Sequence, residues 1–101
     1  MLPRRRRLRA EEVREVLKSG RSKRGKVLLI KTISAPPPFR CAVVVSKKVA
    51  PRATVRNVLR RSIYRALSEG FLPPSGHAVL LVQSTPTETL LADDIRTLLH
   101  V

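Results

Sequence analysis

Aromatic residues are scarce in this chain of 101 residues, which contains two Phe, one Tyr and no Trp. The core must therefore be built from Leu, Val, Ile and Ala, and one small domain is expected at this length. No stretch approaches the roughly 18 apolar residues of a membrane-spanning helix, and the basic N-terminus lacks the apolar run of a secretory signal. These absences favour a cytoplasmic globular protein with no membrane-spanning segment.

Residues that perform catalysis or bind metals are also few. The single cysteine, Cys41, has no partner for an internal disulfide and lies in an apolar run, which indicates a buried small side chain. Neither His77 nor His100 has a partner motif for general-base catalysis. Asp93 and Asp94 point about 100° apart on a predicted helix, so we expect them at the solvated surface. With no zinc spacing or phosphate-binding loop, the sequence predicts no catalytic residue, no metal site and no tightly bound cofactor.

Acidic residues are missing from a long central part of the chain. Between Val16 and Ser68 there is no Asp or Glu, whereas the same span contains 14 Lys and Arg, and the formal net charge of the chain is +14. Repulsion between like charges opposes folding, so a polyanionic partner is the simplest explanation. Composition alone permits a nucleic acid, an anionic membrane surface or an acidic protein.

The apolar pattern predicts an α+β fold, a small mixed β-sheet packed with helices in the order α-β-β-α-β-α. Residues 1–9 are expected to form a basic arm, in which the four consecutive arginines Arg4 to Arg7 stay disordered unless an anion binds them, and residues 10–101 a single α+β domain. The expected elements are a helix over 10–19, a basic loop over 21–26, strands over 26–34 and 39–46, a helix from Thr54 to Gly70, a strand over 77–83, and a helix capped by Thr85, Pro86 and Glu88 with Leu90, Leu91, Ile95, Leu98 and Leu99 buried. The dense run of Val in the second strand suggests burial on both faces. The second strand, the central helix and the third strand form a βαβ unit with parallel strands.

The central helix lies in the stretch SKKVAPRATVRNVLRRSIYRAL, residues 46–67. At about 100° per residue it has an aliphatic side and a basic side. The aliphatic side holds Val55, Val58, Leu59, Ile63, Ala66 and Leu67, and the basic side holds Arg56, Asn57, Arg60, Arg61, Tyr64 and Arg65. The guanidinium fork suits phosphate oxygens, Asn57 suits a base edge or ribose, and Tyr64 suits stacking on a base. Such a face is often only a solvated surface, but the absence of intervening acids favours anion binding.

This stretch resembles the signature of the protein subunit of bacterial ribonuclease P. The family pattern runs Ser-Lys-Lys, then an Arg-Asn-Arg core, then two basic residues a turn later. Here it reads Ser46-Lys47-Lys48-Val49, then Ala53-Thr54-Val55-Arg56-Asn57, then Arg60-Arg61 and Arg65, with Val58 at the second core Arg and Tyr64 where a further Arg is common. The resemblance covers nearly the whole chain, including Leu2-Pro3 and Arg7-Leu8-Arg9. It implies a left-handed βαβ crossover, as in ribosomal protein S5 domain 2, although such crossovers are generally right-handed.

The resemblance also implies an activity without protein catalytic residues. In bacterial ribonuclease P the RNA subunit carries the active site and binds the catalytic Mg²⁺, and the enzyme is an endoribonuclease that removes the 5′ leader of precursor tRNA. We therefore expect a cytoplasmic subunit, monomeric within the ribonucleoprotein, with the catalytic RNA and precursor tRNA as partners. The residues predicted to bind RNA are Lys47, Lys48, Arg52, Arg56, Asn57, Arg60, Arg61, Tyr64 and Arg65.

The family also has a cleft between the first helix and the sheet that binds the single-stranded leader and is usually lined by aromatic residues. The matching positions here are Val13, Leu17 and Lys31, with Arg14 and Lys18 beside them. Stacking on an aromatic ring contributes roughly 1–3 kcal/mol per base. Aliphatic side chains recover less of this energy, so we expect leader binding to depend more on charge.

Other functions fit parts of the sequence. A non-catalytic basic RNA-binding structural protein, such as a small ribosomal protein, has the same composition, and only the motif separates it from a ribonuclease P subunit. A DNA-binding module that places the central helix in the major groove is disfavoured, because the basic residues cover a wide arc. Membrane-surface binding is disfavoured because the core needs the aliphatic side of the helix.

Overall fold

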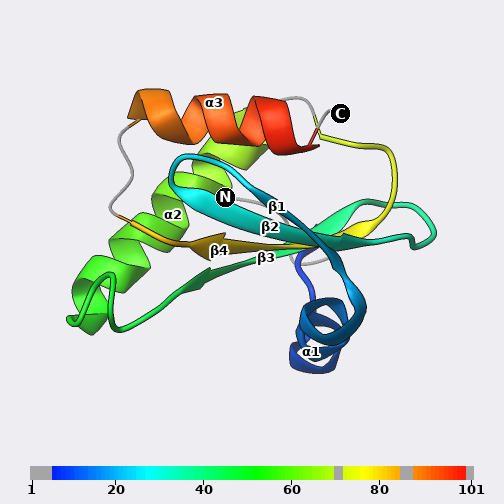
Figure 1. Ribbon diagram of the computed structural model, residues 1–101, viewed down its shortest axis with the longest axis horizontal. Helices are drawn as coiled ribbons and strands as arrows, with labels where there is room; N and C mark the ends of the chain where they lie inside the picture. The colour runs from blue at the N-terminus through cyan, green and yellow to red at the C-terminus, as the bar shows by residue number, and fades with distance from the viewer. Residues whose placement is uncertain (1–5, 70–71, 85–87, 100–101) are drawn as a thin grey trace.

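The computed structural model describes residues 6–69, 72–84 and 88–99. A four-stranded sheet has α2 and α3 on one face and α1 on the other (Figure 1). The elements are α1 (Ala10–Ser19), β1 (Arg21–Arg24), β2 (Leu28–Ile33), β3 (Arg40–Val45), α2 (Ala53–Glu69), β4 (His77–Val82) and α3 (Glu88–Leu99). The predicted α+β class is confirmed. None of the described helices is both long enough and apolar enough to cross a membrane.

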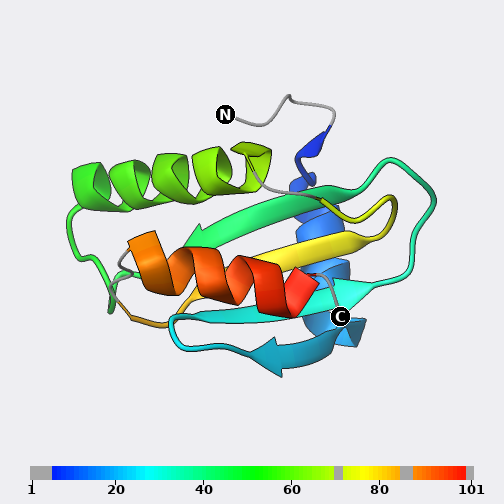
Figure 2. The same ribbon diagram turned by 90° about the horizontal axis from the view of Figure 1, so that it is seen from above.

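The strands lie in the order β1-β2-β4-β3. β2 pairs antiparallel with β1 and β4, while β3 and β4 are parallel, with Arg40 opposite His77 and Val45 opposite Val82. The predicted βαβ unit is therefore present. In Figure 2 the sheet is seen from the side of α2, and β3 and β4 both point to the left, with β4 below β3. Along the strand direction β4 therefore lies to the left of β3, which makes the crossover left-handed.

β1 is the element that the sequence analysis missed, because residues 21–24 were expected in a loop. Arg21 lies opposite Thr32 and Arg24 opposite Leu29, and all four β1 residues are exposed. The strand has no apolar alternation because neither side of it enters the core. It forms through backbone pairing with β2 across a short turn, in which the N–H of Gly25 donates to the carbonyl of Leu28 at 2.7 Å.

The main core lies between the sheet and the helix pair α2 and α3. In β3 the buried residues are Cys41, Val43 and Val45, whereas Ala42 and Val44 lie on the other face of the sheet and are only half-buried. The expectation that this strand is buried on both faces is therefore wrong, because on that face α1 packs mainly on β2 and β4. The fully buried side chains of the main core include Leu28, Ile30, Ile63, Leu67 and Leu80.

Asp94 corrects the prediction that both adjacent carboxylates of the last helix lie at the surface. It is 4% exposed, and its carboxylate accepts hydrogen bonds from the backbone N–H groups of Lys26, Val27 and Leu28 at 2.8, 2.8 and 2.9 Å. A Cβ on Gly25 would lie 2.5 Å from the carboxyl carbon of Asp94, so only glycine permits this approach. Asp94 therefore fastens the turn between β1 and β2 to α3.

Part of the last helix agrees with its prediction. Leu91 and Ile95 are buried and Leu90 is half-buried, as expected. The proposed cap residues Thr85 and Pro86 lie outside the described residues. So do Gly70 and His100 and the side chains of Glu88, Leu98 and Leu99.

Candidate RNA interface

A basic surface follows the turn before α2 and the length of that helix. We call Lys47, Lys48, Arg52, Arg56, Asn57, Arg60, Arg61 and Arg65 the α2 basic surface. Ala50 is buried and its N–H donates to the carbonyl of Ser46 at 3.1 Å, which closes the turn. The anchored turn leaves Lys47 and Lys48 exposed beside the first residues of α2.

Two members of this surface also have structural contacts. Arg56 donates from Nη1 to the carbonyl oxygens of Ala50 and Pro51 at 2.9 and 2.8 Å, so it ties the turn to the helix. Arg60 donates to the side-chain oxygen of Asn57. Both arginines are half-buried, whereas Arg52, Arg61 and Arg65 are exposed. The exposed arginines Arg52, Arg61 and Arg65 are therefore the ones best placed to reach phosphate groups.

No carboxylate neutralises this surface within the described side chains. The ion pairs among the described side chains join Arg40 to Glu12 and Arg96 to Asp93, and neither involves α2 or the turn before it. Exposed cations without acidic neighbours keep a positive potential that attracts polyanions. The sequence prediction of an uncompensated basic face is thus supported by its position on the outside of the domain.

The predicted orientation of α2 was wrong at three residues. Val55 and Val58 were expected in the core but are 44% and 58% exposed, whereas Tyr64 was expected among the RNA-binding residues but is 9% exposed. The hydroxyl of Tyr64 accepts a hydrogen bond from the backbone N–H of Val43 at 3.2 Å, and burial raises the pKa of this hydroxyl. Its ring packs in the core, so Tyr64 is not available for stacking on a base.

The predicted leader-binding residues lie on the other face of the sheet, where α1 packs on β2 and β4. Val13 and Leu17 are half-buried, and Arg14 and Lys18 are exposed one turn apart. The ammonium of Lys31 donates to the carbonyl of Leu17 at 3.2 Å. This contact places Lys31 against the C-terminal end of α1, where a cation interacts favourably with the helix dipole. The structure thus brings Leu17 and Lys31 together.

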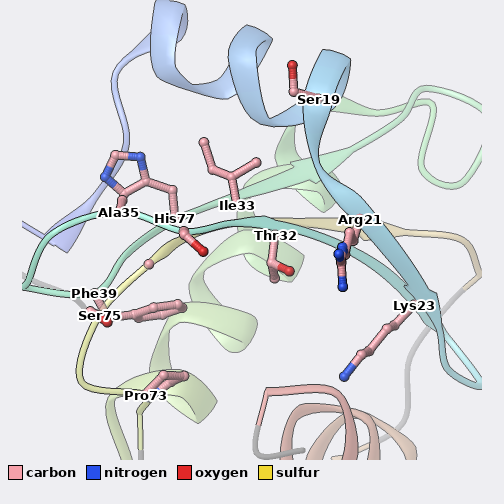
Figure 3. A pocket seen from close by; sticks show the side chains of 12 residues that line it. Ser19, Arg21, Lys23, Thr32, Ile33, Ala35, Phe39, Pro73, Ser75 and His77 are labelled. Atoms are coloured by element: carbon pink, nitrogen blue, oxygen red, sulfur yellow. The ribbon is translucent and has the colours of Figure 1, made fainter.

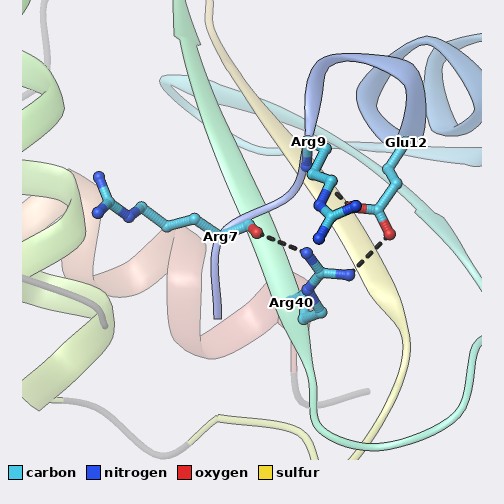
Figure 4. A network of polar contacts seen from close by, with 4 residues as sticks. All are labelled: Arg7, Arg9, Glu12 and Arg40. Atoms are coloured by element: carbon cyan, nitrogen blue, oxygen red, sulfur yellow. Dashed lines mark hydrogen bonds and ion pairs between the residues drawn. The ribbon is translucent and has the colours of Figure 1, made fainter. Parts of the chain in front are cut away.

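A polar network attaches the start of α1 to β3, and the sequence analysis did not identify it. Arg40 pairs with Glu12 at 2.7 Å and donates to the carbonyl of Arg7 at 2.9 Å, while the N–H of Arg9 donates to Glu12 at 2.8 Å (Figure 4). The backbone hydrogen bond from Arg9 holds the pKa of Glu12 below its usual value against the opposing effect of burial, and the charge of Arg40 lowers this pKa further. Glu12 three residues after Arg9 is the spacing that could have indicated this cap.

The same region includes the end of the basic arm predicted over residues 1–9. The N–H of Leu8 donates to the carbonyl of Cys41 at 3.0 Å, and Arg7 forms a parallel bridge with Cys41. Residues 6–9 therefore lie along β3, while residues 1–5 are outside the described part of the chain. α1 follows this contact and lies on the face of the sheet opposite α2 (Figure 1).

The described residues offer little for protein-based catalysis. Burial raises the pKa of the Cys41 thiol to about 12, so it is not a thiolate nucleophile at neutral pH. No group of three or more His, Cys, Asp or Glu that could hold a metal ion occurs within residues 6–69, 72–84 and 88–99. What the described surface does offer is Lys and Arg side chains that can bind anions.

Comparisons with known proteins agree with this geometry. A family model described as Ribonuclease P matches residues 2–100. The fold is similar to a Staphylococcus aureus RNase P protein, with a TM-score of 0.75, 17% identity, and coverage of 91% of this chain and 90% of that one. It is also similar to an RNase P protein from Thermotoga maritima, with a TM-score of 0.66, 22% identity, and coverage of 89% and 80%. No curated protein sequence matches significantly.

Proposed function

Since this chain belongs to the Ribonuclease P family and is a protein subunit of that tRNA-processing enzyme, we propose that it binds the catalytic RNA through the α2 basic surface. The face with α1 binds the 5′ leader of precursor tRNA. Cleavage is performed by the RNA subunit with Mg²⁺ that this RNA binds, and the protein acts as a cytoplasmic monomer within the ribonucleoprotein. Precursor tRNA and the catalytic RNA are its two partners.

The observation that carries this proposal is the placement of two sets of cations on two faces. The α2 basic surface has no described acidic partner, and Arg14 and Lys18 lie with α1 across the sheet from it. Two RNA molecules repel each other through their phosphates, and a cationic protein between them lowers that repulsion. A protein with one basic face would bind RNA but would not bring a second RNA molecule to it.

The direct test is cleavage of a precursor tRNA by a bacterial ribonuclease P RNA at low Mg²⁺, with and without the protein. We expect the protein to increase the cleavage rate about tenfold or more at low Mg²⁺ and less at high Mg²⁺, where the metal itself screens the phosphates. RNA binding without any increase in cleavage would reject the subunit function and favour a structural RNA-binding protein.

A second test addresses the leader face. Val13 is half-buried on α1 and takes the place of an aromatic residue expected from the family. We expect Val13→Phe to tighten binding of long-leader precursors about fivefold, because a ring can stack on a base. Affinity is measured by titrating the ribonucleoprotein against labelled precursors with long and with minimal leaders. Equal changes for both precursors would show that residue 13 does not contact the leader, and Val58→Phe on α2 serves as the control for an added exposed ring.

A further inference from the structure

A hollow of about 630 Å³ opens where β2 ends and β3 and β4 begin (Figure 3). Figure 3 shows Arg21 and Lys23 of β1 on one side of it and Phe39 and Pro73 on the opposite side, with Thr32 of β2 between them. Its two cations, Arg21 and Lys23, lie on β1, at the opposite edge of the sheet from β3, on which α2 packs. The RNA contact proposed for α2 therefore does not account for it.

The side with Arg21 and Lys23 suits a phosphate group. The two residues alternate along β1, so both side chains extend from the same face of the strand, and both are exposed. Neither forms an ion pair with a described carboxylate. The hydroxyls of Thr32, Ser34 and Ser75 line the same hollow and add hydrogen-bonding groups. Two cations with nearby hydroxyls match the charge and the oxygen atoms of a phosphodiester.

The opposite side is apolar and suits a sugar or a base. Pro73, which is half-buried, lines this side of the hollow. Phe39 also borders the hollow, but its ring is 3% exposed and belongs to the core, so it offers little surface to a ligand. The volume lies within the usual range of roughly 300–1,000 Å³ for small-ligand sites, which is enough for one nucleotide. A hollow with cations at one side and a hydrophobic wall at the other matches the two ends of a nucleotide.

We propose that this hollow binds one nucleotide unit of single-stranded RNA, with its phosphate on Arg21 and Lys23 and its ribose or base against Pro73. The proposal rests on the proposed function only in taking RNA as the partner. The nucleotide can come from the precursor leader or from an unpaired segment of the catalytic RNA. The chemistry is the same for both sources, and the experiment separates them.

The first arm uses the protein alone, labelled with ¹⁵N, and titrates it with a short oligouridine and with inorganic phosphate. We expect amide shifts at Thr32, Ser34 and Gly76 with oligouridine and smaller shifts with phosphate. Arg21→Ala with Lys23→Ala should weaken the binding reported by these amides about tenfold, because each lost contact is a hydrogen bond to a charged group. The matched control, Arg24→Ala with Lys26→Ala, removes the same charge from adjacent exposed residues that do not line the hollow.

Two results of this arm would overturn the proposal. One is equal weakening by both double variants, which would show a general effect of charge. The other is a set of shifts that leaves the hollow unaffected. Both variants replace exposed residues, and thermal unfolding confirms that they are folded.

The second arm identifies the source of the nucleotide in the reconstituted ribonucleoprotein. Weaker binding of long-leader precursors alone assigns the hollow to the leader, and weaker binding of the catalytic RNA alone assigns it to that RNA. Losses no larger than those of the control variant in either measurement would refute the site. Stimulation of cleavage by the wild-type protein is measured in the same series, so a failure of the proposed function is seen separately from a failure of the hollow.

Discussion

Asp94→Asn is expected to lower the free energy of unfolding by about 3 kcal/mol, because three backbone N–H groups lose a charged acceptor in a buried site. The amide of Asn also brings two N–H donors toward these backbone donors, so the turn cannot be satisfied as before. Urea unfolding followed by circular dichroism measures the change. We expect the loss to be accompanied by faster amide exchange at Lys26, Val27 and Leu28.

The adjacent carboxylate provides a matched control. Asp93 pairs with Arg96 one helical turn away, and both side chains of this pair are more than one-third exposed. Exposed ion pairs contribute only about 0–1 kcal/mol, so Asp93→Asn should change stability little. Equal effects of the two substitutions would mean that Asp94 does not fasten the turn between β1 and β2.

Arg61→Ala with Arg65→Ala is expected to weaken binding to the catalytic RNA about 100-fold near physiological salt, since each residue is proposed to contact a phosphate. The slope of log K against log salt should fall in magnitude by about two, because two fewer counterions are released. Filter binding or fluorescence anisotropy at several salt concentrations measures both quantities. Both residues are exposed, so stability should change little.

The control for this variant is Arg24→Ala with Lys26→Ala, which removes the same charge near the opposite edge of the sheet. We expect it to retain most of the affinity. A loss as large as that of the α2 variant would show that total charge, and not the α2 basic surface, determines binding. Arg56 is a poor choice for this test, because its contacts with Ala50 and Pro51 combine binding with the structure of the turn.

The elements with periodic apolar residues were predictable from the sequence. The first helix was predicted at residues 10–19 and α1 spans Ala10–Ser19, and the βαβ unit was predicted with its parallel strands. β1 was not predictable because its residues form a strand through backbone pairing alone. The predicted orientation of α2 was wrong at Tyr64, because the helical projection places side chains by polarity. The polar hydroxyl of Tyr64 is satisfied inside the core by the backbone N–H of Val43, so the residue can be buried.

The candidate site was predicted in the same uneven way. Residues such as Lys47 and Arg61 are exposed as expected, because local sequence suffices to place a long cation on a helix or turn. Contacts across long sequence separations were missed. Asp94 and Lys26 are 68 positions apart, and Arg40 and Glu12 are 28 positions apart. Their pairing depends on the packing of whole elements, and no local pattern encodes it.

The edges of the sheet have a consequence for how copies of the protein behave together. On the outer side of β3, the carbonyl of Cys41 and the N–H of Val43 are occupied by Leu8 and Tyr64. Among the described residues, none occupies the outer backbone groups of β1 in this way. The strand instead carries three exposed cationic side chains, Arg21, Lys23 and Arg24. Strand-to-strand aggregation would bring these like charges together, so their repulsion keeps RNA-free copies dispersed at low ionic strength. Added salt screens that repulsion, so aggregation through the unpaired edge of β1 becomes more favourable at high protein concentration.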